Sequence, residues 1–170
     1  MDTREQNPLE FEVSGLISEV RSVGLPFGDY RAEYLEGSRS TVVFERKNVA
    51  DLYGTMTSGH KRFMREVKRA KDAEAKLVLA VEGTIEEVAE GYEYSQFKGE
   101  SMLKTLGTLM FKHGIPTMFN PTRADMVRMM TWVFESEGYH RARTASLRSA
   151  EKHLDALTKN EASGNATVAV

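Results

Sequence analysis

The 170-residue chain has no cysteine, one tryptophan, four prolines and no apolar run approaching the ~18 residues of a membrane-spanning helix. The lack of cysteine excludes disulfides, thiol nucleophiles and cysteine metal sites, so a reducing, cytoplasmic location is expected. The first residues, MDTREQNPLEF, also lack the apolar core of a signal peptide, and no membrane partner is expected. A glycine-rich phosphate loop is missing as well, which argues against a nucleotide cofactor.

What the chain does have is charge that is segregated along its length. The formal net charge is −2, with 28% charged and 41% hydrophobic residues, as in an ordinary globular domain. Residues 37–71 carry nine basic and three acidic side chains, whereas residues 1–36 carry three and eight, and residues 72–102 carry two and eight. A basic block between acidic ones fits either a footprint for a polyanion or a solvated helix face. The pattern alone leaves both open.

The hydrophobic periodicity predicts an α/β fold with a mixed β-sheet flanked by helices. Strand-like runs occur at 20–25, 30–35, 41–44, 77–81 and 115–119, with a turn expected at Gly37–Ser38. Helical stripes follow Asn48, with an interruption near Gly59, and recur at 85–89, 102–111, 126–134 and 139–157. Residues 77–81 are all apolar, which is typical of a strand covered on both faces.

Charged residues stand at the ends of two neighbouring strands. Asp29 opens the strand at 30–35, and Glu45-Arg46-Lys47 closes the next one. If these strands pair as a hairpin, Asp29 and Glu45 meet at one end of the sheet. Glu45 and Lys47 are two residues apart, so both point to the same face of the strand. Two carboxylates and a lysine are therefore expected to converge in one cleft.

Such a set suits the hydrolysis of a phosphodiester. Carboxylate oxygens hold Mg²⁺, which keeps several waters and binds phosphate oxygens. The ion acidifies water and neutralises developing charge. A lysine beside it orients the nucleophile and adds positive charge.

This spacing resembles the XPF-type nuclease domain of the structure-specific endonucleases, a branch of the PD-(D/E)XK superfamily. The family pattern is Gly-Asp, a variable gap, Glu-Arg-Lys, and an Asp four residues after the Lys. Here it reads Gly28-Asp29, Glu45-Arg46-Lys47 and Asp51. The resemblance spans residues 2–137, and it continues in three further motifs: Asp2-Thr3-Arg4-Glu5, Ser58-Gly59 with Arg62, and Glu82-Gly83. Members of the family have an apolar strand before the first Asp, so that strand is expected to be absent or shortened here.

The resemblance implies a restriction-endonuclease-like core and a DNA endonuclease that requires Mg²⁺, for which Mn²⁺ substitutes. Asp29 and Glu45 would be the metal ligands, and Lys47 would position the attacking water. Arg46 would contact phosphate or brace the site, and Asp51 would support Arg46 or the metal. The motif also assigns supporting roles to Asp2 and Arg4. Compact members of this type occur in bacteriophages, and an origin there would place the chain in the host cytoplasm.

The same resemblance divides the chain into a nuclease domain at 1–137, a helical extension at 138–158 and a disordered tail at 159–170. Many relatives bind DNA and dimerise through a C-terminal pair of helix–hairpin–helix motifs, whose glycine-bearing hairpins residues 138–170 lack. DNA is therefore expected on the nuclease domain, through backbone contacts that carry no sequence code. The candidate contacts are Arg46, Lys61, Arg62, Arg65, Lys68 and Arg69, with Arg141, Arg143 and Arg148 from the last helix.

The sequence leaves three functions open. The first is a metal-dependent endonuclease selective for branched, flap or four-way (Holliday) junction DNA, as used in DNA repair and recombination. The second is a non-catalytic DNA-binding or scaffolding module of the same fold. The third is a nuclease of the same superfamily for general DNA degradation. The apolar stripe of 126–134 fits either a domain core or a homodimer interface.

Overall fold

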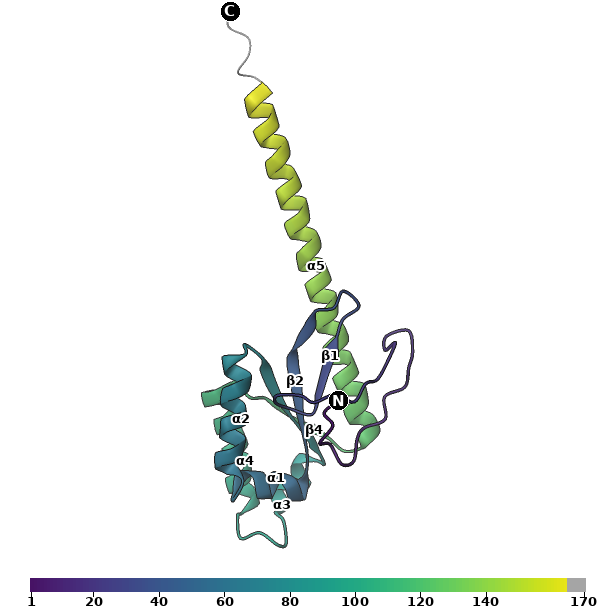
Figure 1. Cartoon of the computed structure of the whole chain (residues 1–170). Coiled ribbons are helices and arrows are strands. Elements are labelled where there is room, and N and C mark those ends of the chain that lie inside the picture. Colours follow the sequence, from purple (N-terminus) through teal and green to yellow (C-terminus); the bar gives the residue numbers. More distant parts are fainter. Residues whose placement is uncertain (165–170) are drawn as a thin grey trace, which may run out of the picture. The chain divides into compact units, whose positions relative to one another are not determined.

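The computed structural model describes residues 1–164, which form two compact units, Met1–Phe134 and Glu135 onward. The first unit contains four strands and the helices around them (Figure 1). The elements in chain order are β1 (Tyr30–Glu33), β2 (Arg39–Asn48), α1 (Val49–Met56), α2 (His60–Asp72), β3 (Lys76–Glu82), α3 (Ile85–Glu90), α4 (Gly99–His113), β4 (Thr117–Asn120) and α5 (Arg123–Gly164). The second unit consists of the later part of α5.

The four strands form one mixed sheet, as the sequence predicts, and the structure gives their order as β1-β2-β3-β4. Strands β1 and β2 are antiparallel and form the expected hairpin, with Tyr30 opposite Phe44. Its turn contains Gly37 at φ +83°, a backbone conformation that glycine adopts without steric cost. The pairs β2–β3 and β3–β4 are parallel, so helices cross over between them.

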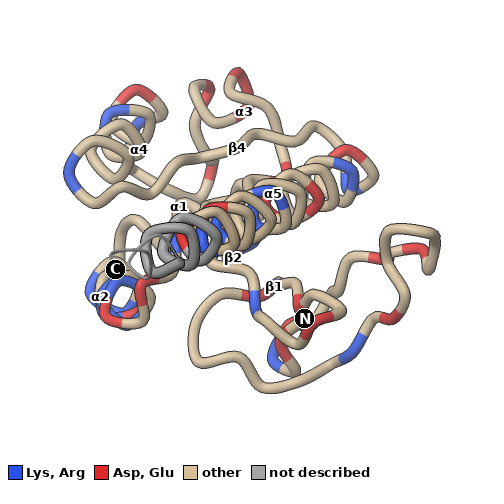
Figure 2. Tube along the Cα trace, turned by 90° about the horizontal axis from the view of Figure 1, so that it is seen from above, with Lys and Arg blue, Asp and Glu red and all other residues tan. Residues whose placement is uncertain are grey.

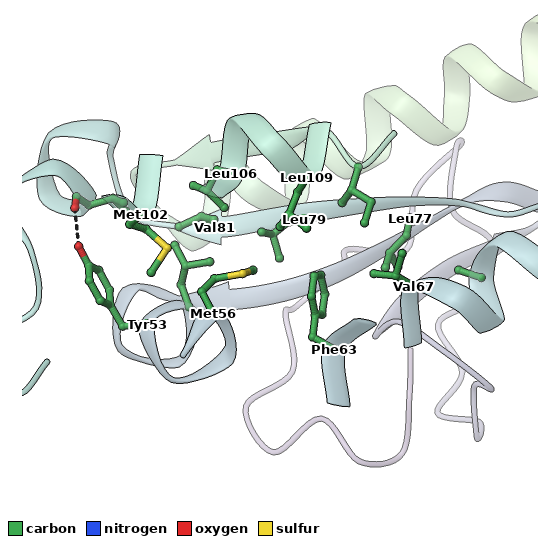
Figure 3. Packing of buried hydrophobic residues seen from close by; sticks show 14 of the residues in the cluster. Tyr53, Met56, Phe63, Val67, Leu77, Leu79, Val81, Met102, Leu106 and Leu109 are labelled. Atoms are coloured by element: carbon green, nitrogen blue, oxygen red, sulfur yellow. Dashed lines mark hydrogen bonds between the residues drawn. The ribbon is translucent and has the colours of Figure 1, made fainter. Parts of the chain in front are cut away.

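Alternation along the strands divides the apolar side chains between two faces of the sheet. On one face, Leu77, Leu79 and Val81 pack against helices α1, α2 and α4, and Figure 3 shows residues of this cluster converging on β3. On the other face, Phe44 and Val78 pack with a second set that includes Leu9, Met126 and Met130. The methionine stripe at the start of α5 therefore supplies core residues.

This alternation also sorts the polar residues at the end of β2. Val43 belongs to the cluster under α1 and α2, and Phe44 belongs to the opposite cluster. With a side-chain period of two, Glu45 and Lys47 share the face of Val43, and Arg46 lies on the face of Phe44. Within the Glu-Arg-Lys triplet, Glu45 and Lys47 therefore lie on one face of the sheet, and Arg46 lies on the other.

Helix boundaries follow the signals in the sequence. The side-chain oxygen of Asn48 accepts the Asp51 N–H at 2.8 Å, which caps α1 as predicted. The helical stripe is interrupted at Thr57–Gly59 between α1 and α2. Helix α4 ends at Gly114, which takes the left-handed conformation common at this position.

Two expectations about secondary structure are wrong. Residues 20–25 form no strand, because their pairing is limited to a single bridge between Val23 and Asp2 in a stretch interrupted by Gly24 and Pro26. The helix expected to end at 157 continues to Gly164, into the predicted tail. The rest of that tail, 165–170, lies outside the described residues. None of the described helices is long and apolar enough to span a membrane.

Candidate active site

The end of the β1–β2 hairpin brings the predicted catalytic residues together. The Asp29 N–H donates to the Phe44 carbonyl at 2.7 Å, which fixes Asp29 beside the end of β2. The Asp29 carboxylate in turn accepts the Arg46 backbone N–H at 2.8 Å. The Lys47 ammonium donates to the Glu45 carboxylate and to the Arg46 carbonyl. Both Glu45 and Lys47 are largely buried.

Burial dominates the electrostatics of this cluster. Burial raises the pKa of Glu45 to about 8, although the neighbouring Lys47 acts in the opposite direction. Burial likewise raises the pKa of Asp29 to about 6, against the charge of Lys47 and the Arg46 N–H. For Lys47, burial alone would lower the pKa, yet the charges of Glu45 and Asp29 raise it. The site therefore holds a lysine that stays charged and two carboxylates whose ionised forms are compensated only in part.

A hard divalent cation fits this donor set. Mg²⁺ is held in proteins by one or two carboxylates, with waters and substrate phosphates completing its shell. Asp29 and Glu45 supply two carboxylates whose ionised forms such a cation would stabilise. Among the side chains that the structure describes, no group of three Asp, Glu, His or Cys residues gathers as a closed metal site. The arrangement thus suits an open site that shares its cation with substrate.

The raised pKa values predict an unusual pH dependence of stability without metal. Between the ordinary value of ~4 and the folded values of about 6 and 8, the folded protein binds more protons than the unfolded chain. The free energy of unfolding must therefore fall as pH rises from 5.5 to 8, by at least about 1 kcal/mol. Urea unfolding in EDTA at the two pH values measures this fall, and Mg²⁺ is expected to reduce it. A metal-free protein that gains stability over this range would contradict the assignment.

Arg46 occupies the opposite face of the sheet, where it connects β2 with β3 and with the N-terminal segment. Its guanidinium pairs with Glu82 of β3 and, at 3.3 Å, with Glu5. It also donates to the Asn7 carbonyl at 3.2 Å. Only 8% of this side chain is exposed. Of the two roles that the sequence left open for Arg46, the geometry favours bracing over contact with phosphate.

Asp2 and Arg4 form a second brace. The Asp2 carboxylate accepts the Arg4 guanidinium at 2.7 Å and the Leu25 N–H, and the Arg4 side chain donates to the Leu25 carbonyl. The hydrogen bond from Arg4 lowers the pKa of Asp2 to about 2, against the effect of burial. The Asp2 N–H also donates to the Asp29 carbonyl at 2.7 Å. These contacts hold the backbone that leads into Asp29.

An open pocket of about 510 Å³ extends from Lys47 towards the turn between α1 and α2. Its lining residues are Lys47, Ala50, Asp51, Gly54, Thr55, Ser58, Gly59 and Arg62. Asp51 is exposed here and accepts the Asn48 side-chain amide at 2.8 Å. The predicted support of Arg46 by Asp51 is absent, because Arg46 pairs on the opposite face with Glu5 and Glu82.

The predicted DNA contacts between residues 61 and 69 lie on α2, where Figure 2 shows basic residues gathered along the helix. All of them are exposed: Lys61, Arg62, Arg65, Lys68 and Arg69. Lys68 pairs with Asp72 at 2.6 Å, and the Arg69 guanidinium donates to the Pro26 carbonyl at 3.2 Å. Arg141, Arg143 and Arg148 belong to the part of α5 that forms the second unit.

The sequence analysis missed one residue of this region, Glu66 of α2. Its carboxylate accepts the Gly28 N–H at 2.8 Å, and its charge acts on Asp29, Glu45 and Lys47. A signal was present in the sequence, because Glu66 is the one acidic residue between Lys61 and Lys71. The helical period places it between the buried residues Phe63 and Ala70 and the exposed basic side chains.

Comparisons with known proteins identify the family and the fold of the chain. The model of the ERCC4 domain family matches residues 1–131 of the chain. Among solved structures, the chain is similar to XPF from Aeropyrum pernix, with a TM-score of 0.58 and 20% identity over 83% of this chain and 66% of that one. It is also similar to XPF from Aeropyrum pernix in complex with DNA, with a TM-score of 0.48 and 19% identity over 72% of this chain and 54% of that one. No curated protein matches it by sequence.

Proposed function

The chain belongs to the ERCC4 domain family and has the XPF-type nuclease fold, and we propose that it is a metal-dependent DNA endonuclease. One observation carries the proposal. The carboxylates of Asp29 and Glu45 and the ammonium of Lys47 meet at one end of the hairpin, in the pattern of the family. The chain spans 66% of the length of the XPF chain that it resembles, so activity and substrate are argued from its own residues.

The residues of the site have different tasks in the proposed reaction. Mg²⁺, or Mn²⁺ in its place, would be held by Asp29 and Glu45 and would supply Lewis-acid stabilisation of the phosphate. Lys47 remains charged, so its ammonium orients a water whose oxygen attacks phosphorus while the P–O bond to the leaving oxygen breaks. The ammonium stabilises the added negative charge, and the proton of the water passes to solvent. The buried Arg46 and Asp2 braces hold the strand ends in place during the reaction.

The basic residues around the site indicate where DNA would bind. The pocket beside Lys47 is bordered by Arg62, and the exposed basic face of α2 continues from there. Phosphates bound along this face would place one phosphodiester at the carboxylates. Such contacts recognise the backbone, so selectivity would come from the shape of branched, flap or junction DNA.

Replacing Arg65 by Ala is expected to weaken DNA binding without affecting the fold, since Arg65 is exposed on α2. One lost phosphate contact lowers the slope of log affinity against log salt by about one and the affinity roughly fivefold. Fluorescence anisotropy at several salt concentrations measures both quantities. The matched control is Arg39→Ala at the opposite end of β2, where the side chain is also exposed. Equal binding by the two variants would exclude Arg65 as a DNA contact.

A cleavage panel separates the proposal from its alternatives. Linear duplex, single strand, flap, fork and four-way junction DNA are each incubated with Mg²⁺, Mn²⁺ or EDTA. A structure-selective endonuclease cuts branched substrates in the presence of metal and spares linear duplex. Equal degradation of all substrates would favour a general nuclease. Binding with no cleavage under any metal would favour a scaffolding module.

A further inference from the structure

The backbone that precedes Asp29 is held by side chains from other parts of the fold. Asp2 and Arg4 hold Leu25, and Arg69 of α2 donates to the carbonyl of Pro26. Glu66 of α2 then accepts the N–H of Gly28. Helix α2 thus contacts this segment at two points within three residues.

Gly28 is the point where this segment turns into the site. Its φ is +68°, and a Cβ at this position would overlap the side chain of Val43. The backbone therefore passes close to β2 in a conformation that glycine alone adopts readily. The hydrogen bond to Glu66 holds the Gly28 peptide in this orientation, and the next residue is the proposed metal ligand Asp29.

Glu66 also brings charge to the site. Its negative charge acts on Asp29, Glu45, Lys47 and Arg4, and it is partly buried. A third carboxylate near two metal ligands raises the local affinity for a divalent cation even when it does not touch the ion.

From these contacts we infer that Glu66 is a positioning residue for the cation site: it holds the Gly28–Asp29 turn from α2 and adds the negative charge that strengthens binding of a divalent cation. The inference rests on the proposed function and assigns a role to a residue outside the Gly-Asp and Glu-Arg-Lys motifs. It also links the helix that carries the proposed DNA contacts to the turn that carries a metal ligand.

Two substitutions separate the effects of Glu66. Glu66→Gln keeps an oxygen that accepts the Gly28 N–H and removes the charge, whereas Glu66→Ala removes both. The matched control is Asp72→Asn, which removes a negative charge from the exposed end of the same helix. Binding of Mn²⁺ without DNA is measured by electron paramagnetic resonance, and thermal unfolding of each variant is recorded without metal.

The expected result is a Mn²⁺ dissociation constant raised roughly tenfold by Glu66→Gln and at least as much by Glu66→Ala, with Asp72→Asn close to wild type. Wild-type affinity in both Glu66 variants would overturn the inference and leave the proposed function intact. Weak binding by Glu66→Ala alone, together with a lowered melting temperature, would reduce Glu66 to a purely structural residue and overturn it as well. If the wild-type protein binds no Mn²⁺, the proposed metal site fails and this inference fails with it.

Discussion

Replacing Glu45 by Gln is expected to reduce DNA cleavage by on the order of a thousandfold or more, which corresponds to about 4 kcal/mol of lost transition-state stabilisation. The neutral amide keeps the size of the side chain but removes one of the two carboxylates that would hold the cation. It also removes the negative charge that pairs with the Lys47 ammonium. Single-turnover cleavage of a labelled branched substrate in Mg²⁺ measures the loss.

The matched control for this variant is Glu33→Gln, which removes a carboxylate from the neighbouring strand at an exposed position. Its cleavage rate is expected to stay within about twofold of wild type, because surface ion pairs contribute little. The free energy of unfolding of Glu45→Gln is expected within about 1 kcal/mol of wild type, which separates lost chemistry from lost structure. Undiminished cleavage by Glu45→Gln would exclude Glu45 as a metal ligand.

Replacing Gly28 by Ala is expected to lower the free energy of unfolding by about 2–4 kcal/mol, the largest stability effect predicted for the site. The new Cβ would overlap Val43 and lie 3.1 Å from the Phe44 carbonyl oxygen, in the core under β2. The left-handed φ of +68° adds a cost of roughly 1 kcal/mol for any residue with a Cβ. The melting temperature should fall by roughly 5–12 °C, as calorimetry can measure.

Gly24→Ala serves as the control for this substitution, because a Cβ at that position meets nothing within 4 Å. Its stability is expected to stay within about 0.5 kcal/mol of wild type. The rate of DNA cleavage by Gly28→Ala should also fall at temperatures where the variant is still folded, because the turn at Gly28 orients Asp29 in the site. Equal stability of the two variants would contradict the close approach of Gly28 to β2.

Much of the architecture was predictable because local signals and the hydrophobic pattern agree. The all-apolar run at 77–81 is buried on both faces, the hairpin pairs where Gly37 allows the turn, and Asn48 and Gly114 mark helix ends. Residues 20–25 form no strand because their apolar residues have no neighbouring strand with which to pair beyond the single bridge from Val23 to Asp2. Val20 and Val23 are exposed, so the pattern reflects no buried face.

The candidate site was predictable to the extent that strand geometry determines it. The period of two along β2 places Glu45 and Lys47 on one face, and the hairpin register brings Asp29 beside them. The same period assigns Arg46 to the opposite face, but its partners come from Glu5 and Glu82, which are distant in sequence. Glu66 was missed for a similar reason, because its contact with Gly28 spans 38 residues and follows from the packing of α2 alone.

The proposed metal-dependent cleavage is tested most directly by single-turnover cleavage of a branched DNA. The wild-type protein is assayed with Mg²⁺ and with EDTA, beside Glu45→Gln. We expect cleavage that requires the metal and disappears in the variant, while both proteins bind the DNA. Binding without cleavage by the wild-type protein in Mg²⁺ and in Mn²⁺, or cleavage that persists in Glu45→Gln, would contradict this expectation.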